Sequence, residues 1–236
     1  MKRKSLVRSI ARRVGLHVEP LMPDLMDFLA SREITTVFDV GANMGQFAES
    51  LRKKGYCGRI VSFEPIKQVF AQLEAKARRD PLWTVHNCAL GERAGQATIN
   101  VSSESVFSSI LGQRHAATVH AAVSANVRTE TIAVATLDDV FAEFATENCF
   151  LKIDTQGFER QVIAGAARAL RSLRGLQMEL PVIHLYENVW TLSQAIDHMA
   201  DRGFVVSQVD PVSFHSRDGC AVIELDRIFR RRSDLD

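Results

Sequence analysis

Hydrophobic and polar positions follow two alternating periods along the chain from about residue 34 onward. Short runs rich in β-branched and aromatic residues are separated by longer stretches with apolar residues three and four positions apart. This alternation is typical of a mostly parallel sheet whose strands are connected by helices. The predicted strands are 36–40, 59–64, 83–88, 150–154, 176–180, 204–209 and 221–225. We therefore expect an α/β fold with a seven-stranded, mostly parallel sheet, helices on both faces and an antiparallel final strand.

Residues 92–135 interrupt this pattern, because they are rich in Ser, Thr, Ala and Gln. Two alternating stretches, 97–101 and 129–135, predict hairpin-like strands that flank an insertion. The chain is thus expected to consist of an N-terminal extension, 1–33, and one domain, 34–236, that carries the insertion.

Two further expectations concern the second half of the chain. Apolar residues at helical spacing from Val162 to Leu170 predict one helix after Gly157. The closely spaced arginines near the C-terminus are interpreted as a solvated tail, and they are Arg227, Arg230, Arg231 and Arg232.

Composition and charge exclude several classes of protein. Hydrophobic residues make up 46% and charged residues 24%, as in an ordinary globular domain. The formal net charge of +1 gives no overall field that would attract nucleic acid, so no nucleic-acid partner is expected. The four cysteines lack zinc-ligand spacing, and no segment resembles a secretion signal or a membrane span. We expect a cytoplasmic protein with reduced thiols, and we assign no metal-ligating residues.

Residues 1–19 carry Lys and Arg ahead of the first acid, Glu19, with apolar residues at helical spacing among them. The favoured interpretation is a basic helical extension that packs its apolar stripe on the domain. The alternative is loose contact with an anionic membrane surface, which would make the cytoplasmic protein peripheral to the inner face of the membrane.

The end of the first strand carries the most informative motif. Glycines at 41 and 45 allow close approach of backbone at the positive N-terminus of the next helix, and Asp39 adds a carboxylate. A dinucleotide fingerprint reads G-x-G-x-x-G, whereas this turn reads G-x-x-x-G after an acid. A carboxylate here would repel pyrophosphate and attract an ammonium group, which favours a zwitterionic or cationic ligand.

Glu64 ends the second strand, about 20 residues after the turn, where an acid can accept hydrogen bonds from ribose hydroxyls. A ligand with both a ribose and an amino-acid ammonium group is S-adenosylmethionine. Each feature alone would be explained as well by a tight turn or an exposed carboxylate. Their occurrence together, in this order, favours the cofactor.

Five successive motifs then resemble the FkbM-type S-adenosylmethionine-dependent methyltransferases of the Rossmann-like class. They are Asp39-Val-Gly-Ala-Asn-Met-Gly45, Ser62-Phe-Glu-Pro65, Asn87-Cys-Ala-Leu-Gly91, Thr136-Leu-Asp-Asp139 and Lys152-Ile-Asp-Thr-Gln-Gly157 with Glu159. The resemblance covers about residues 34–180, and the last two motifs are the most specific to the family.

The resemblance implies roles for particular residues. Asp39, Gly41, Asn43 and Gly45 would hold the methionine part of the cofactor, Glu64 the ribose, and Asn87 or Cys88 the edge of the adenine. The family usually has an acid at the position of Gln156. This departure weakens the case for a divalent metal there, and the metal requirement stays open.

Methyl transfer to an alcohol also needs a group that accepts the hydroxyl proton. Asp154 at the end of a strand is the first candidate, followed by His184, whose ordinary pKa suits neutral pH, and by Glu179. Each has a structural alternative: Asp154 could position the cofactor or cap a helix, Glu179 could pair with Lys152, and His184 could be an exposed loop residue.

Lys152 interrupts a strand expected to be buried on both faces, so its ammonium group needs a partner. We expect this partner to be Asp154, Glu179 or an acid of the Thr136 motif. The insertion, with Ser108, Ser109, His115 and His120, is the natural place for acceptor recognition.

The sequence therefore predicts an O-methyltransferase that acts on a hydroxyl of a small-molecule, sugar or glycolipid acceptor. Two alternatives remain at this point. One is a nicotinamide-dependent oxidoreductase or epimerase, which the glycine spacing disfavours. The other is a catalytically silent, methyltransferase-like binding domain, which Gln156 would suit. The sequence leaves the oligomeric state open.

Overall fold

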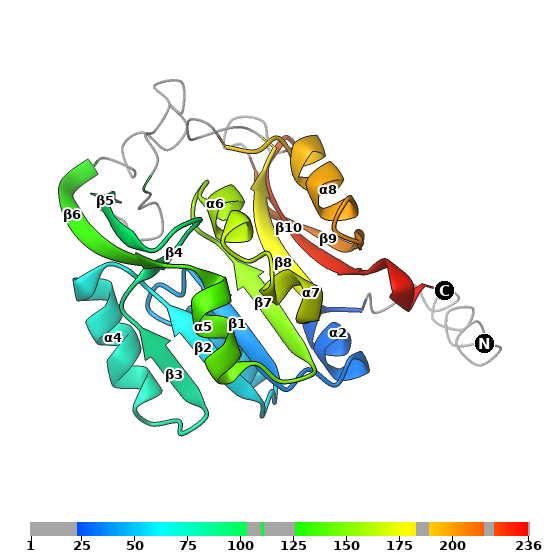
Figure 1. Cartoon of the computed structure of the whole chain (residues 1–236), viewed down its shortest axis with the longest axis horizontal. Coiled ribbons are helices and arrows are strands. Elements are labelled where there is room, and N and C mark those ends of the chain that lie inside the picture. Colours follow the sequence, from blue (N-terminus) through cyan, green and yellow to red (C-terminus); the bar gives the residue numbers. More distant parts are fainter. Residues whose placement is uncertain (1–22, 103–109, 111–125, 183–188, 215–219, 236) are drawn as a thin grey trace, which may run out of the picture.

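The computed structural model describes residues 23–102, 110, 126–182, 189–214 and 220–235. Its main sheet has seven strands in the order β3-β2-β1-β7-β8-β10-β9 (Figure 1). The strands are β1 Thr36–Val40, β2 Arg59–Phe63, β3 Trp83–His86, β7 Cys149–Ile153, β8 Leu173–Pro181, β9 Phe204–Phe214 and β10 Val222–Arg231. β10 runs antiparallel to both of its neighbours, and the pairs from β3 to β8 are parallel. The expected seven-stranded sheet with an antiparallel end is confirmed.

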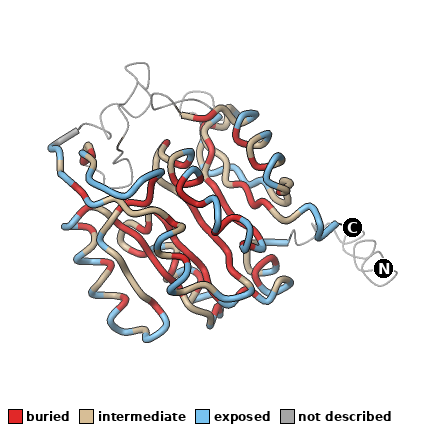
Figure 2. Tube along the Cα trace, in the orientation of Figure 1, coloured by how far each residue is buried: buried red, intermediate tan, exposed pale blue. Residues whose placement is uncertain are grey.

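Helices cover both faces of this sheet and form a three-layered molecule (Figure 1). One face packs against α2 Leu25–Ser31, α3 Gln46–Lys53 and α4 Lys67–Ala77. The other packs against α5 Leu137–Phe144, α6 Glu159–Ala164, α7 Ala169–Ser172 and α8 Leu192–Ala200. The central strands are buried almost throughout (Figure 2), because apolar side chains on both faces meet a helix layer.

The inserted region forms a small sheet of its own, with β4 Ala89–Leu90, β5 Gly95–Ser102 and β6 Asn126–Ala135 in the order β4-β6-β5. β5 and β6 pair in antiparallel fashion, as the alternating stretches predicted. The third predicted strand is shorter than expected, because the chain leaves the main sheet after His86 and Ala89–Leu90 pairs with β6 instead. Ile66, Ile99 and Ile132 lie in the core between this sheet and the domain.

The single helix predicted through Val162 and Leu170 is wrong, since two short helices, α6 and α7, replace it. The Asp138 carboxylate accepts hydrogen bonds from the backbone N–H groups of Arg168 and Ala169 at 2.9 and 2.8 Å. In a continuous helix these two N–H groups would bind carbonyl oxygens of the preceding turn. Because they bind Asp138 instead, the first helix ends and a new helix, α7, begins at this point.

The interpretation of the C-terminal arginines as a solvated tail is wrong for Arg227, Arg230 and Arg231, because β10 continues to Arg231, whereas Arg232 lies beyond the strand and is exposed. Arg227 is buried and donates a hydrogen bond to the Leu225 carbonyl. Arg231 donates to the carbonyl oxygens of Leu170 and Leu173, and its guanidinium lies over the Phe204 ring. The long side chains of these arginines pack on the sheet while their charged ends bind backbone carbonyls.

The N-terminal extension ends in α2, which starts with a capping box formed by Asp24 and Asp27. Phe28 and Leu29 of this helix are buried in the domain core, where the Phe28 ring lies 5.6 Å from that of Phe150. The predicted basic helix in residues 1–19 lies outside the described residues. Within the described ranges, no helix is long and apolar enough to cross a membrane.

Candidate active site

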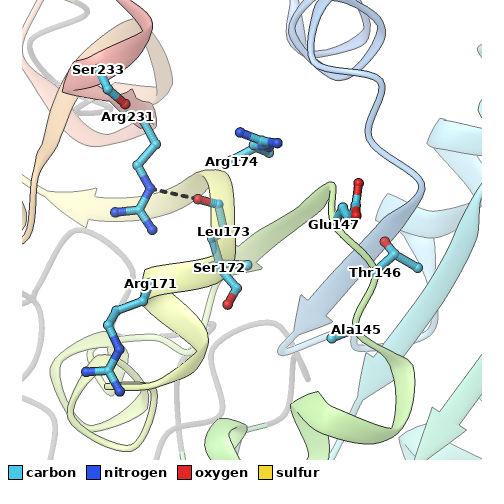
Figure 3. Close-up of a pocket in the computed structure, with 9 residues that line it drawn as sticks. All are labelled: Ala145, Thr146, Glu147, Arg171, Ser172, Leu173, Arg174, Arg231 and Ser233. Carbon is cyan, nitrogen blue, oxygen red and sulfur yellow. Dashed lines mark hydrogen bonds between the residues drawn. The ribbon is translucent and has the colours of Figure 1, made fainter.

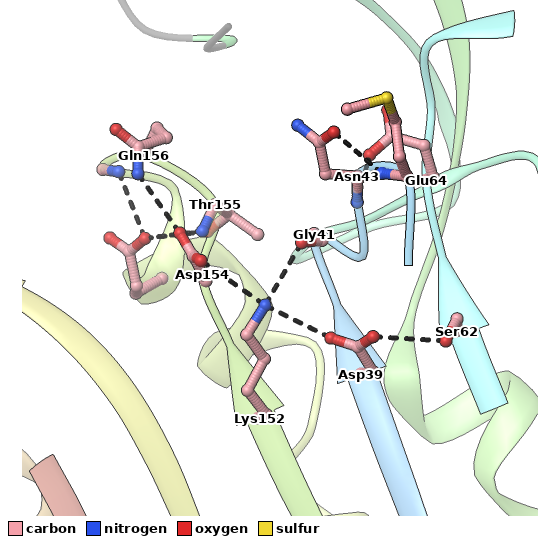
Figure 4. A network of polar contacts seen from close by, with 12 residues as sticks. Asp39, Gly41, Asn43, Ser62, Glu64, Lys152, Asp154, Thr155 and Gln156 are labelled. Carbon is pink, nitrogen blue, oxygen red and sulfur yellow. Dashed lines mark hydrogen bonds and ion pairs between the residues drawn. The ribbon is translucent and has the colours of Figure 1, made fainter. Parts of the chain in front are cut away.

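The glycine turn lies at the carboxyl end of β1, beside the end of β7 (Figure 4). Gly41 has a φ of 75°, and a Cβ added there would lie 1.8 Å from the Asp154 carbonyl oxygen. Gly45 has a φ of 87°, and its added Cβ would lie 2.7 Å from the Trp83 ring. Both glycines are therefore required by the protein's own packing, which presses the turn against β7 and β3.

Lys152 joins the turn to two strands. Its Nζ lies 3.2 Å from Asp39 Oδ1, 3.4 Å from Asp154 Oδ2 and 3.2 Å from the carbonyl oxygen of Gly41. Asp39 is fully buried, and its second carboxylate oxygen accepts a hydrogen bond from Ser62 at 3.2 Å. Asp154 is thus an expected partner of Lys152, and Asp39 is one that the sequence did not suggest.

The charges of this cluster are mutually stabilised. Burial lowers the pKa of Lys152, but the carboxylates of Asp39 and Asp154 outweigh it and hold this pKa above its ordinary value. Burial raises the pKa of Asp39, and Lys152 and Ser62 counter part of that effect. Because the Asp39 carboxylate is wholly enclosed by protein, its predicted contact with the cofactor stays a prediction.

Glu64 links the ends of β1 and β2. Its carboxylate accepts hydrogen bonds from the backbone N–H of Asn43 at 3.0 Å and of Ile66 at 2.9 Å. Asn43 itself has a φ of 49°, so this bond holds a residue in the left-handed region. Burial raises the pKa of Glu64 to about 7, although the two amide donors oppose the rise.

Asn87 and Cys88 follow β3 at the same edge of the sheet. The Asn87 amide donates to the carbonyl oxygens of Glu64 and Pro65 at 2.9 and 3.1 Å, which ties this loop to the end of β2. Cys88 is half-buried, and burial raises the pKa of its thiol to about 11, so it is neutral at physiological pH. Their predicted place at the adenine edge stays a prediction.

The candidate bases lie one strand further along. The Asp154 side chain keeps 34% of its surface exposed and accepts a hydrogen bond from Gln156 at 3.2 Å. Glu179 on β8 lies close to Asp154 and to Glu224 of β10. Burial, reinforced by these two acids, raises the pKa of Glu179 above its ordinary value, which favours its protonated form. His184 lies outside the described residues.

The sequence from residue 39 to residue 206 matches the methyltransferase FkbM domain. The chain belongs to the FkbM methyltransferase family. It is therefore an S-adenosylmethionine-dependent methyltransferase, and its sheet has the Rossmann-like form of that class.

Solved structures that resemble this FkbM methyltransferase include a FkbM methyltransferase from Methylobacillus flagellatus, with 18% identity and a TM-score of 0.49. That match covers 83% of this chain but only 44% of the other. Another is magnesium protoporphyrin IX methyltransferase from Synechocystis with bound S-adenosylmethionine, with 11% identity, a TM-score of 0.47, and 86% and 74% of the two chains covered. No curated protein matches the chain.

Two polar residues of this FkbM methyltransferase were not given a role from its sequence. Ser62 lies opposite Asp39 in the parallel register of β1 and β2, as Lys152 does in that of β1 and β7. Glu159 is buried, and it accepts hydrogen bonds from Thr155 and from the backbone N–H of Gly157. The register of β1 and β2 could have predicted that Ser62 contacts Asp39. No local sequence pattern predicts that the Glu159 side chain is buried.

Within the described ranges of the FkbM methyltransferase, no group of three or more His, Cys, Asp and Glu residues is placed to hold a metal ion. At the position where the family usually has an acid, Gln156 uses its amide to bind Asp154. Ser108, Ser109, His115 and His120 of the insertion lie outside the described residues.

Proposed function

We propose that this enzyme transfers the methyl group of S-adenosylmethionine to a hydroxyl oxygen of a small-molecule, sugar or glycolipid acceptor. The observation that carries the proposal is the position of Asp154. Its carboxylate is partly exposed at the carboxyl end of β7, in contact with the lysine that holds the glycine turn. A group that can take a proton thus lies beside the turn that we assign to the cofactor.

The cofactor is assigned to the turn from Gly41 to Gly45, to Glu64 and to the loop with Asn87 and Cys88. A carboxylate that already accepts two backbone N–H bonds has further lone pairs, which suit ribose hydroxyls. We assign Asp39 a positioning role, since it acts on the turn through Lys152 and Gly41. Glu64 therefore suits the ribose of the cofactor, and the turn from Gly41 to Gly45 is assigned to its methionine part.

The cofactor supplies a methyl group on a positively charged sulfur. In the reaction, the acceptor oxygen forms a bond to that methyl carbon, the carbon–sulfur bond breaks with its electron pair on sulfur, and the hydroxyl proton passes to Asp154. The protein contributes mainly by holding donor and acceptor in line. Burial and the carboxylates of Asp154 and Glu224 raise the pKa of Glu179, which favours its protonated form, so Glu179 ranks behind Asp154 as the base and can donate a hydrogen bond to it. His184 stays the second candidate.

Substitution of the proposed base tests this reaction. The measurement is transfer of radiolabelled methyl from the cofactor to a panel of sugars, small alcohols and glycolipid extracts. Asp154→Asn should abolish turnover and leave affinity for S-adenosylhomocysteine within a few-fold of that of the wild type. Asp197→Asn, on the exposed side of α8, removes the same charge and should leave both unchanged. Full turnover by Asp154→Asn would show that Asp154 is not the base.

A silent binding domain is the one rival that the structure gives a reason to test. The Gln156 amide donates a hydrogen bond to Asp154 Oδ1 and so occupies one oxygen of the proposed base. If the wild type binds S-adenosylhomocysteine but methylates none of the acceptors, the silent domain is favoured. The alternative of a nicotinamide-dependent enzyme has no such support, because the chain belongs to a methyltransferase family.

A further inference from the structure

A polar pocket lies at the opposite edge of the sheet from the glycine turn. It has a volume of about 1010 Å³ and opens where β7 and β8 begin, whereas the turn lies where β1 ends. Its walls are the loop between α5 and β7, the junction of α7 and β8, and the end of β10 (Figure 3). We call it the arginine pocket, because Arg171, Arg174 and Arg231 line it.

Positive charge dominates this pocket. Three guanidinium groups face one acid, Glu147, which gives a formal excess of two positive charges among the lining residues. Within the described part of the chain, none of the three arginines forms a salt bridge. Figure 3 shows the arginines along one side of the pocket and Glu147 on the other.

The three arginines divide into one framework residue and two that are available for a ligand. Arg231 is committed to the backbone carbonyls of Leu170 and Leu173, so it caps the end of α7. Among the described residues, Arg174 donates only through its Nε, to Asn148 Oδ1 at 3.0 Å, and this bond fixes the side chain. Arg171 is exposed in the last turn of α7. The terminal nitrogens of Arg174 and Arg171 bind no other residue that the structure describes, so they are the donors of the pocket.

Guanidinium groups of this kind bind phosphate oxygens through paired, charge-assisted hydrogen bonds. The hydroxyls of Ser172 and Ser233 are exposed in the same pocket and can add neutral donors. Separate donors along one wall suit a ligand with more than one anionic oxygen. We propose that the arginine pocket binds a phosphorylated ligand, at a site separate from that of methyl transfer.

The phosphate could belong to a soluble metabolite or to the headgroup of a lipid, and two probes distinguish them. Inorganic pyrophosphate is titrated into the full chain by calorimetry, and vesicles of phosphatidylglycerol with phosphatidylcholine are compared with pure phosphatidylcholine by co-sedimentation. In the double variant Arg171→Gln/Arg174→Gln, binding of the matching probe should weaken by about tenfold or more, since charge-assisted hydrogen bonds are lost.

The matched control is Arg78→Gln/Arg79→Gln, which removes the same charge from the exposed end of α4. It should bind both probes as the wild type does, and both double variants should keep wild-type affinity for S-adenosylhomocysteine. Loss of pyrophosphate binding in the first variant alone identifies a soluble ligand, and loss of vesicle binding alone identifies a lipid headgroup. Equal weakening in both variants, or no binding of either probe by the wild type, would overturn the proposal.

Discussion

Lys152 and Asp39 lie opposite each other on two neighbouring, fully buried strands, with 3.2 Å between Nζ and Oδ1. The same ammonium group reaches the Gly41 carbonyl and the Asp154 carboxylate. One buried ion pair thus connects the glycine turn to the proposed base. Substitutions can separate the contribution of this ion pair to the free energy of unfolding from the contribution of the turn to cofactor binding.

Lys152→Met should lower the free energy of unfolding by about 3–5 kcal/mol, because it leaves the enclosed Asp39 carboxylate without its partner. The double variant Asp39→Asn/Lys152→Met removes both charges and should recover part of this loss. Urea denaturation of the two variants and the wild type measures the difference. A loss below about 1 kcal/mol in Lys152→Met would mean that the pair contributes little.

Gly41→Ala should abolish binding of S-adenosylhomocysteine. The new methyl group would meet the Asp154 carbonyl oxygen at 1.8 Å, so the turn would have to leave β7. Gly55→Ala is the matched control, because Gly55 also has a positive φ but nothing lies within 4 Å of an added Cβ. Calorimetric titration should show normal affinity for Gly55→Ala. Equal affinities for the two variants would contradict the tight turn.

The pH dependence of stability should report on Glu64. Its pKa rises from 4.5 to about 7 on folding, so the folded state binds more protons between these values and loses stability as the pH rises through them. The stability advantage of Glu64→Gln over the wild type should therefore grow between pH 5 and pH 8, by about 3 kcal/mol at most. Urea midpoints across this range measure it. A constant difference would show that the Glu64 pKa is not raised.

Arg231→Gln should destabilise the fold by about 1–3 kcal/mol, since it leaves the carbonyls of Leu170 and Leu173 without their donor. Arg232→Gln, at the exposed next position, should change the free energy of unfolding by less than about 0.5 kcal/mol. Thermal denaturation compares the two. Similar effects of both substitutions would support a solvated tail.

Sequence periodicity was sufficient to predict the sheet, because its central strands are buried on both faces and appear as short apolar runs. The location of the site could also be predicted, because the carboxyl ends of parallel strands meet at one edge of the sheet. The local hydrophobic pattern gave wrong predictions where a residue distant in the sequence determines the structure. Asp138 starts α7 in the middle of an apolar period, and the carbonyl groups of α7 draw Arg231 into the fold.

In the candidate site, too, the positions of residues along the strands could be predicted, whereas contacts between distant strands could not. The places of Gly41, Glu64 and Asp154 at strand ends could be predicted from the sequence. The enclosure of Asp39 could not, because it depends on Lys152 from a strand more than 100 residues away. The raised pKa of Glu179 likewise depends on acids of two other strands.

Calorimetric titration of the folded wild-type chain with S-adenosylhomocysteine shows whether the carboxyl edge of the sheet binds the cofactor. We expect saturable binding at one site, which Glu64→Ala weakens by about tenfold or more through the loss of hydrogen bonds to the ribose. The absence of binding heat at several temperatures, with circular dichroism showing a folded protein, would contradict the assignment of this edge of the sheet to the cofactor.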